Sequence, residues 1–336
     1  MKKFVKILTI SLSAAVFMQP SHFFAAEATQ KVLLGGQPFG VKFYSDGVMV
    51  VELEPFFSEG RYVCPAAESG VEVNDVIKKI NNEDVKTNED VQRATHNCGG
   101  EKLRLTVERG GKELIKTIQP QKNMVGVYLS GAWVRDSCAG IGTVTYYRPS
   151  DQSFAALGHG ICDRDTTALM PLGSAEVVQA DINSVTKSST GKAGSLNGIF
   201  SDTTLGHLTK NTNCGVFGTT NDKNIPSGTE LEIADNGEIK LGKAAMYTTV
   251  SGETPGCYEV EITDICNFGS RTNENFVIKV TDERLLSECG GIVQGMSGSP
   301  LVQNGKLVGA VTHVFLNSPQ EGYGVTAQNM VSNYCS

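Results

Sequence analysis

Residues 291–300 read Gly-Ile-Val-Gln-Gly-Met-Ser-Gly-Ser-Pro, and the apolar segment that follows contains a turn signal at Asn304-Gly305. Glycine permits the unusual backbone angles of a tight turn. Such a turn exposes the hydroxyl of Ser297 and directs neighbouring backbone N–H groups at one point, as the stabilisation of an oxyanion requires. We therefore expect Ser297 to be a nucleophile, with the N–H groups of Gly295 and Ser297 as oxyanion donors.

The pattern Gly-x-Ser-Gly-x-Pro is typical of chymotrypsin-like serine proteases. The nucleophile elbow of α/β-hydrolases is a poorer alternative, because it requires a helix after the serine. Here Pro300 opens a predicted strand. A structural turn rich in Gly and Ser is the other interpretation, and it would be preferred if the motif stood alone.

A nucleophilic serine needs a base, and the chain contains five histidines. His159 lies between two glycines at the end of an apolar run, where an imidazole can project into a cleft. His207 and His313 are rivals, and His313 falls on a predicted strand, a common place for a packed histidine. His22 lies in the N-terminal segment and His96 in the first predicted domain. We expect His159 to be the general base.

A basic histidine of this kind is held by an acid that fixes its tautomer and stabilises the imidazolium. Asp282 ends a strand-like run 15 residues before Ser297, and we expect it to orient His159. Asp163 and Asp165 are nearer to His159 in the sequence, and they are equally suited to capping a turn or orienting the backbone.

From about residue 121 the chain consists of short apolar runs separated by Gly, Asn, Asp and Ser, without a long amphipathic helix. Short strands at this spacing predict an all-β barrel or sandwich. Residues 121–336 are therefore predicted to form the peptidase domain, with a chymotrypsin-like double barrel. The segment 183–200, rich in Ser, Gly and Lys, is predicted to be a surface loop or a flexible hairpin.

Before residue 120, alternating apolar strands at 48–53, 76–80 and 103–108 surround a short helical stretch at 89–95. This succession resembles a bacterial PDZ domain over residues 32–119. The resemblance is carried by Phe39-Gly40-Val41, by Pro65-Ala66-Ala67-Glu68-Ser69-Gly70-Val71, by Asn74-Asp75-Val76-Ile77, and by Ile80-Asn81-Asn82 with Val85.

A PDZ-like domain binds an extended peptide as an added strand at a sheet edge, and backbone N–H groups of a glycine-bearing loop bind its terminal carboxylate. Phe39, Gly40 and Val41 are the expected loop, although an ordinary turn also explains Gly40. The aromatic segment 54–64 is longer than usual, which affects the shape of the groove. C-terminal peptides, or the protein's own N-terminus, are the expected ligands.

The composition excludes other classes of protein. With 336 residues, 40% hydrophobic and 19% charged, the chain can build two domains with cores. The net charge is −7 and no basic run occurs, so a nucleic-acid partner is not expected. Nine cysteines occur without zinc-finger spacing, so a structural metal is not expected. Acyl transfer by a serine and a histidine requires neither a metal nor an organic cofactor. Cys162 and Cys289 lack the local sequence of a thiol-protease nucleophile.

The N-terminus predicts export. Three lysines within the first six residues precede the apolar run 7–18, and Ala26-Glu27-Ala28 has the small-x-small pattern of a cleavage site. We expect residues 1–28 to be a signal peptide. The apolar run is short for a transmembrane span, and an uncleaved anchor is the alternative.

Taken in order, these segments resemble the stage IV sporulation protein B family, the SpoIVB-type serine endopeptidases of endospore-forming bacteria. The PDZ-like region is followed by Leu-Gly-His-Gly-Ile-x-Asp, by Val-Thr-Asp-x-x-Leu-Leu and by Gly-Gly-Ile-Val-Gln-Gly-Met-Ser-Gly-Ser-Pro. The resemblance covers nearly all of the chain after the N-terminal segment. It implies Ser297 as nucleophile, His159 as general base and Asp282 as orienting acid.

The same resemblance implies export into the space between mother cell and forespore and self-cleavage near the N-terminus. It also implies cleavage of a membrane-bound regulator, so that an intramembrane metalloprotease releases a late sigma factor. A self-cleavage site is not evident in the short connection before the PDZ-like region. The competing hypothesis is a catalytically silent exported scaffold whose PDZ-like domain recruits a membrane partner; the complete serine motif favours the protease.

Overall fold

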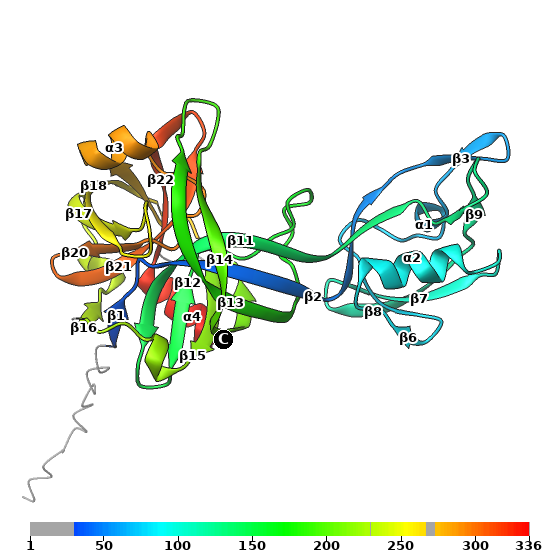
Figure 1. Cartoon of the computed structure of the whole chain (residues 1–336), viewed down its shortest axis with the longest axis horizontal. Helices are drawn as coiled ribbons and strands as arrows, with labels where there is room; N and C mark the ends of the chain where they lie inside the picture. The colour runs from blue at the N-terminus through cyan, green and yellow to red at the C-terminus, as the bar shows by residue number, and fades with distance from the viewer. Residues whose placement is uncertain (1–29, 229, 267–272, 336) are drawn as a thin grey trace, which may run out of the picture.

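The computed structural model describes residues 30–228, 230–266 and 273–335, so the predicted signal peptide lies outside the described residues. Two bodies are joined by the long strands β2 (Pro38–Leu53) and β11 (Ala132–Arg148), which pair with each other antiparallel (Figure 1). The described chain is mainly β, as predicted. None of its helices combines the length and the apolar character needed to cross a membrane.

The smaller body has the elements of a PDZ domain and a core of its own. Strand β5 pairs with β2 and β7, and β7 pairs with β8. Its buried apolar side chains come from between Val48 and Ile118. The elements of this body besides β2 and β11 are β3 (Phe56–Ser58), β4 (Arg61–Val63), α1 (Pro65–Glu68), β5 (Val76–Ile80), β6 (Glu83–Asp84), α2 (Asn88–His96), β7 (Leu103–Arg109), β8 (Lys112–Ile118), β9 (Gln121–Lys122) and β10 (Tyr128–Leu129).

Helix α2 confirms the helical stretch predicted at 89–95 and shows why it begins where it does. Thr87 is the N-cap residue, and its side chain accepts a hydrogen bond from the N–H of Asp90 while the Asp90 carboxylate accepts from the N–H of Thr87. This reciprocal capping satisfies two N–H groups that a helix start leaves without partners. Val91 and Thr95, one turn apart, are the buried positions.

The predicted loop at Phe39, Gly40 and Val41 is wrong. These residues lie within β2, which pairs there with β11 on one side and β13 on the other. Phe39 and Val41 are buried in a core of the larger body. A strand paired on both sides has no free edge for a peptide. The limits predicted for the PDZ-like domain, residues 32 and 119, also change. At its start, β1 and the first half of β2 belong to the larger body. At its end, β9 and β10 after residue 120 belong to the smaller body.

The larger body has two main hydrophobic cores, which confirms the predicted double-barrel fold. One core gathers residues between Leu33 and Val216 and the other gathers residues between Ile182 and Val311. Its elements besides β2 and β11 are β1 (Lys31–Leu34), β12 (Ser153–Ala156), β13 (Leu172–Thr186), β14 (Ser195–Thr212), β15 (Gly215–Thr220), η1 (Asp222–Asn224), β16 (Glu230–Ile233), η2 (Asn236–Glu238), β17 (Gly242–Thr248), β18 (Gly256–Ile265), β19 (Phe276–Val280), α3 (Glu283–Cys289), β20 (Pro300–Gln303), β21 (Lys306–Phe315), β22 (Ser318–Thr326) and α4 (Ala327–Cys335).

The segment predicted as a loop or hairpin at 183–200 is the end of a long hairpin formed by β13 and β14. Its second strand begins beside the serine turn, because the N–H of Leu196 donates to the carbonyl of Gln294 at 2.8 Å. The N–H of Gln294 in turn donates to the carbonyl of Gly194 at 2.9 Å. The hairpin therefore supports one side of the turn that carries Ser297.

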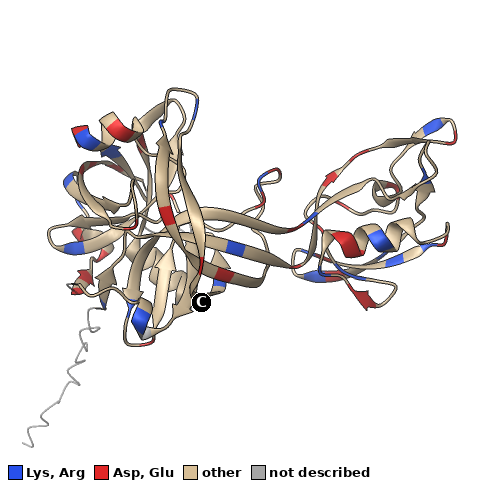
Figure 2. Cartoon of the chain, viewed as in Figure 1, with Lys and Arg blue, Asp and Glu red and all other residues tan. Residues whose placement is uncertain are grey.

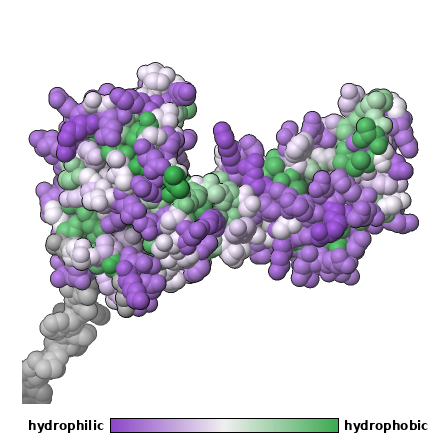
Figure 3. Space-filling model, in the orientation of Figure 1, coloured by the Kyte–Doolittle hydropathy of each residue, from purple (hydrophilic) through white to green (hydrophobic). Residues whose placement is uncertain are grey.

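Charges and apolar side chains are dispersed over the visible surface. Acidic and basic residues alternate over both bodies in Figure 2, without a face of one sign. The hydrophobic areas in Figure 3 are small, and one lies at the far end of the smaller body near β3. There Phe57 is partly exposed and packs edge-to-face on Tyr62.

Candidate active site

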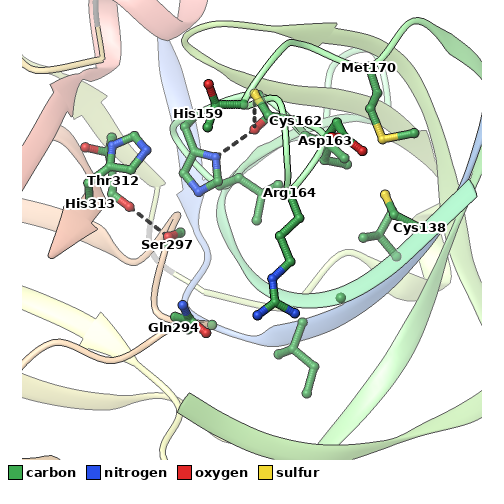
Figure 4. Close-up of a pocket in the computed structure, with 18 of the residues that line it drawn as sticks. Cys138, His159, Cys162, Asp163, Arg164, Met170, Gln294, Ser297, Thr312 and His313 are labelled. Carbon is green, nitrogen blue, oxygen red and sulfur yellow. Dashed lines mark hydrogen bonds between the residues drawn. The ribbon is translucent and has the colours of Figure 1, made fainter. Parts of the chain in front are cut away.

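A pocket of about 910 Å³ is lined by residues from both cores of the larger body. Ser297 and His159 both line it, although they are 138 residues apart in the sequence. Thr312 and His313, from β21, line the same pocket (Figure 4). The structure therefore brings two of the three predicted catalytic residues together.

The turn around Ser297 depends on its glycines. Gly295 and Gly298 have φ values of +99° and +94°, which side chains of L-residues rarely adopt. A Cβ on Gly298 would lie 2.0 Å from the carbonyl oxygen of Thr143 and 2.4 Å from the backbone nitrogen of Leu157. Glycine at this position is what allows the serine turn to lie against β11.

Two threonines of β11 hold the carbonyl groups of the serine turn. Thr143 Oγ1 donates to the carbonyl of Gly295 at 2.8 Å. Thr145 Oγ1 donates to the carbonyl of Gly298 at 2.8 Å. Within the described part of the chain, the N–H groups of Gly295 and Ser297 have no acceptor. Backbone donors that are held in place but unpaired are what an oxyanion hole requires.

The hydroxyl of Ser297 is directed at β21. Ser297 Oγ donates to the carbonyl of Thr312 at 2.8 Å (Figure 4). Among the described residues it has no hydrogen bond to His159. Rotation about χ1 moves a serine Oγ between staggered positions, and catalytic hydrogen bonds often tighten only when substrate is bound.

His159 follows β12, where Leu157 and Gly158 both have positive φ and turn the chain. The Nδ1 atom of His159 lies 2.8 Å from the carbonyl oxygen of Gly160. A carbonyl only accepts hydrogen bonds, so in the neutral ring the proton is on Nδ1 and Nε2 is the free acceptor. This is the tautomer that a general base needs.

The environment of His159 keeps its ring neutral. Burial is the largest influence, and it acts with the neighbouring His313 to lower the pKa of His159 to about 4, whereas the hydrogen bond to Gly160 opposes the shift. Burial disfavours the charged form of a histidine, and so does a second positive charge nearby. At pH 7 the imidazole can therefore accept a proton.

His313 stacks on His159. The two ring centroids are 4.9 Å apart and the rings are tilted by 31°. Sequence reasoning weighed His313 only as a rival base or a packed strand histidine. The sequence signal for His313 was its place on the predicted strand after the serine turn. In the structure it directly follows Thr312, whose carbonyl accepts the hydrogen bond of Ser297.

Asp282 does not reach His159 in the structure. It is the N-cap residue of α3, where Oδ1 accepts from the N–H of Arg284 at 2.9 Å. Its Oδ2 forms an ion pair with Arg284 at 2.7 Å and accepts from the N–H of Glu259 at 3.2 Å. These bonds, chiefly that to the Arg284 side chain, hold the pKa of the Asp282 carboxyl well below its usual range. The structure thus gives the carboxylate of Asp282 a capping role and not the expected orienting role.

The two nearer acids are also engaged elsewhere. Arg135 forms ion pairs with Asp163 and with Asp165, each at 2.6 Å. Asp163 Oδ1 also accepts from the N–H groups of Asp165 and Thr166 at 3.0 and 2.9 Å. Asp163 therefore caps its own turn, which was the alternative weighed for it.

Cys162 lines the pocket, but its surroundings disfavour a thiolate. Its Sγ lies 3.7 Å from the carbonyl oxygen of Gly160. Burial and the nearby Asp163 raise the pKa of Cys162. Cys289 is fully buried in a core, and burial is the main cause that raises its pKa to about 12. A thiol of raised pKa is a poor nucleophile, so the serine has no rival of this kind at either position.

The smaller body carries a second pocket of about 500 Å³ between α2 and the start of β11. Over Ala132–Arg135, β11 pairs only with β2 among the described strands, which leaves its other edge open. Just before this strand, the carbonyls of Ser130 and Gly131 accept from Ala66 and Glu54. The N–H groups of Ser130 and Gly131 have no acceptor within the described chain. A free strand edge that ends in unpaired N–H groups is the arrangement that binds an extended peptide and its terminal carboxylate. The sequence predicts it at residues 39–41, and the structure has it here.

Comparisons with known proteins also separate the chain into a PDZ domain and a peptidase domain. The profile of the PDZ domain matches residues 63–109, and that of the SpoIVB peptidase S55 matches residues 126–331. No curated protein matches the sequence.

Three solved protease structures show weak similarity. The active form of the Rv3671c protease from M. tuberculosis is 13% identical with a TM-score of 0.35, covering 59% of this chain and 74% of that chain. Its inactive form is 13% identical with a TM-score of 0.34, covering 58% and 83%. The HtrA-type protease AlgW with a decapeptide is 13% identical with a TM-score of 0.34, covering 60% and 54%. Similarities this low transfer no residue role and no ligand.

The peptidase profile covers more than half of the chain, and the matched region contains both Ser297 and His159. The PDZ profile falls within the smaller body. A peptidase with a PDZ domain acts on proteins. Membership of a peptidase family favours the protease over the catalytically silent scaffold. The chain belongs to the SpoIVB peptidase S55 family and is a serine endopeptidase.

Proposed function

We propose that Ser297 and His159 form the nucleophile and base of this endopeptidase. The proposal rests on one observation above all: both residues line one pocket, and Gly160 keeps the proton of His159 on Nδ1. The unpaired N–H groups of Gly295 and Ser297 supply the oxyanion donors. Removal of one such donor typically costs about 10²- to 10³-fold in rate.

The reaction is acyl transfer. Ser297 Oγ attacks the peptide carbonyl and passes its proton to Nε2 of His159, while the carbonyl oxygen becomes the oxyanion. The amine leaves with the proton from Nε2, and the substrate carbonyl stays bonded to Oγ. Water then attacks this ester, again losing its proton to His159, and releases the acid and the free serine.

The base is oriented without a carboxylate in this proposal. The carbonyl of Gly160 fixes the tautomer, which is the task that sequence reasoning gave to Asp282. A carbonyl dipole stabilises an imidazolium less than a full negative charge does, because its charge is partial. We therefore expect a slower enzyme than one with a buried aspartate at this position.

The test is a pair of serine variants. Ser297→Ala is expected to abolish peptide cleavage and labelling by a fluorophosphonate, with unchanged circular dichroism. Ser299→Ala is the matched control, because Ser299 is buried two residues away and its hydroxyl has no partner among the described residues. Labelling of the Ser297→Ala variant at the wild-type rate would refute the nucleophile.

We propose further that the PDZ-like body captures protein C-termini in the groove between α2 and β11. The peptide extends the free edge of Ala132–Arg135, and its carboxylate accepts from the N–H groups of Ser130 and Gly131. The apolar lining, which includes Leu129 and Val91, favours an apolar last side chain. The test is binding of free-acid peptides to full-length Ser297→Ala protein. The same peptides with C-terminal amides are expected to bind at least tenfold more weakly, and equal binding would contradict the proposal.

For the biological role we propose an exported signalling protease of sporulation that cleaves itself and a membrane-bound regulator. This rests on the family and on the signal-like sequence of residues 1–28, with the space between mother cell and forespore as its place of action. Mass spectrometry of wild-type and Ser297→Ala protein incubated alone tests self-cleavage. New N-termini only in the wild type are expected. Identical spectra would remove self-cleavage from the proposal, and an intact Met1 in exported protein would remove signal cleavage.

A further inference from the structure

The catalytic pocket is lined by a charged side chain that has no ion-pair partner among the described residues. Of the residues that line it in the described chain, only Arg135, Asp163 and Arg164 carry a formal charge at neutral pH. Arg135 is neutralised by Asp163 and by Asp165, which lies just outside the lining. Arg164 is left over. The formal charges of these two arginines and two aspartates sum to zero, but both ion pairs are made by Arg135 and neither by Arg164.

Arg164 has the placement of a substrate-contacting side chain. It is exposed, and no described residue forms an ion pair with it. Figure 4 shows its side chain extending from its turn into the pocket that also holds Ser297 and His159. A guanidinium with five unpaired donors in a concave site is available for a planar anionic partner.

The turn that carries Arg164 is fixed at both sides. Asp163 Oδ1 accepts two N–H groups of the turn, and the N–H of Thr167 donates to the carbonyl of Asp163 at 2.9 Å. The Asp163 side chain is 0% exposed and is held by Arg135. The backbone of Arg164 is thereby positioned in advance, which lowers the entropic cost of using its side chain in recognition.

We propose that Arg164 is a specificity-determining residue that selects substrates with an aspartate or glutamate side chain near the scissile bond. This inference rests on the proposed catalytic role of Ser297. The carboxylate of the substrate accepts two parallel hydrogen bonds from the guanidinium, a geometry that an ammonium group does not offer. The neighbouring acids Asp163 and Asp165 both form their ion pairs with Arg135, and within the described chain neither forms one with Arg164.

The experiment compares cleavage sites in a peptide library. Wild-type protein, Arg164→Ala and Arg61→Ala are incubated with the library, and the new termini are read by mass spectrometry. Arg61 is the matched control, because it is an exposed arginine of β4 outside the pocket. We expect acidic residues to be enriched at one position near the cleaved bond with wild type and Arg61→Ala, and not with Arg164→Ala.

Matched substrates then measure the preference. Two peptides that differ only by Glu or Gln at the enriched position should differ roughly five- to tenfold in kcat/KM with wild type. The ratio should fall to about one in Arg164→Ala and invert in Arg164→Glu. Raised salt should reduce the wild-type ratio, because screening weakens the attraction between exposed charges.

Failure of this inference and failure of the proposed function give different results. If the library is cleaved and Ser297 is labelled, but the Glu and Gln peptides are cut equally or Arg164→Ala keeps the preference, the role of Arg164 is overturned and the nucleophile stands. If the wild type shows neither cleavage nor labelling, the proposed function is overturned and the selectivity inference with it.

Discussion

At the scale of single residues, the site consists of a serine and a histidine whose partners are backbone carbonyls. Ser297 donates to Thr312, and His159 donates to Gly160. Ser297 is thus oriented by the facing strand β21 and His159 by the carbonyl of the next residue, and no described carboxylate contacts the histidine. His313 adds a second imidazole at 4.9 Å, which makes the charged form of His159 less favourable.

This environment predicts an enzyme that stays active in acid. A lowered pKa means that His159 is the neutral base above about pH 4, so kcat/KM should fall only as the pH drops through that value. An unperturbed histidine would lose activity near pH 6.5. His313→Phe keeps an aromatic ring on His159 but removes the second charge, so we expect its acid limb to move to higher pH. The measurement is a pH profile of kcat/KM.

The control for that profile is His207→Phe, because His207 is exposed on β14 outside the pocket. Its profile should match the wild type. An acid limb of the wild type near pH 6.5, or an unchanged limb in His313→Phe, would contradict the coupling between the two rings.

Asp282 provides a second prediction at this scale. Because its carboxylate caps α3 and pairs with Arg284, we expect Asp282→Asn to keep kcat/KM within about threefold, whereas loss of a triad acid costs about 10⁴-fold. Asp282→Ala should lower the free energy of unfolding by roughly 1–2 kcal/mol, since an alanine cannot cap the helix. Measurements of kcat/KM and of urea unfolding for both variants distinguish a helix-capping role of Asp282 from a catalytic one. A collapse of kcat in the folded Asn variant would restore Asp282 as the orienting acid.

At the scale of elements, the serine turn and β11 form one unit. The turn lies so close to the strand that Gly298 faces the backbone of Thr143 and Leu157, and the threonines of β11 hold the carbonyls on either side of the nucleophile. The local glycine pattern sets the shape of the turn, whereas the direction of its N–H groups is fixed by a strand from a distant part of the chain.

Alanine substitutions at two glycines test whether the serine turn packs this closely on β11. Gly298 and Gly305 both have positive φ, but a Cβ on Gly305 would meet nothing within 4 Å. Gly305→Ala should therefore cost only the strain of its backbone angle, about 1–2 kcal/mol. Gly298→Ala adds an overlap with backbone atoms and should cost about 3 kcal/mol or more, with loss of fluorophosphonate labelling. Equal unfolding free energies for the two variants would show that the turn relaxes freely.

At the scale of the whole molecule, β11 connects the two sites. Its first residues form the free edge beside α2, its middle lines the catalytic pocket, and Thr143 and Thr145 hold the serine turn. The strand is paired with β2 from Ala132 to Thr143, so the connection is a two-stranded ribbon and not a flexible linker (Figure 1). A contiguous, paired element of this kind is a physical route between a peptide groove and a catalytic turn.

Hydrogen exchange of the full-length Ser297→Ala protein measures that route. Binding of a C-terminal peptide is expected to protect the amides of α2 and of 129–134, because an added strand pairs with the free edge. We also expect altered exchange at 141–145 and in the serine turn. The amidated peptide is the control and should change neither region. Protection confined to the smaller body would show that the ribbon does not transmit binding to the catalytic turn.

The sequence by itself determined the features that depend on near neighbours. The nucleophile turn follows from glycines within three residues of Ser297, the helix α2 from its cap at Thr87, and the β class from the spacing of short apolar runs. The order of the PDZ and peptidase profiles along the chain is also a property of the sequence, and it agrees with the predicted family.

Only the tertiary structure decided which strand edges meet. Val41 pairs with Gly140 and Val177, each about a hundred or more residues away, so a segment that resembled a loop became the middle of a sheet. The same long-range pairing freed the edge at Ala132 and brought Arg164 and Ser297 to one pocket. Local sequence does not encode these choices, because pairing across such separations depends on what remains unpaired after the whole chain has packed.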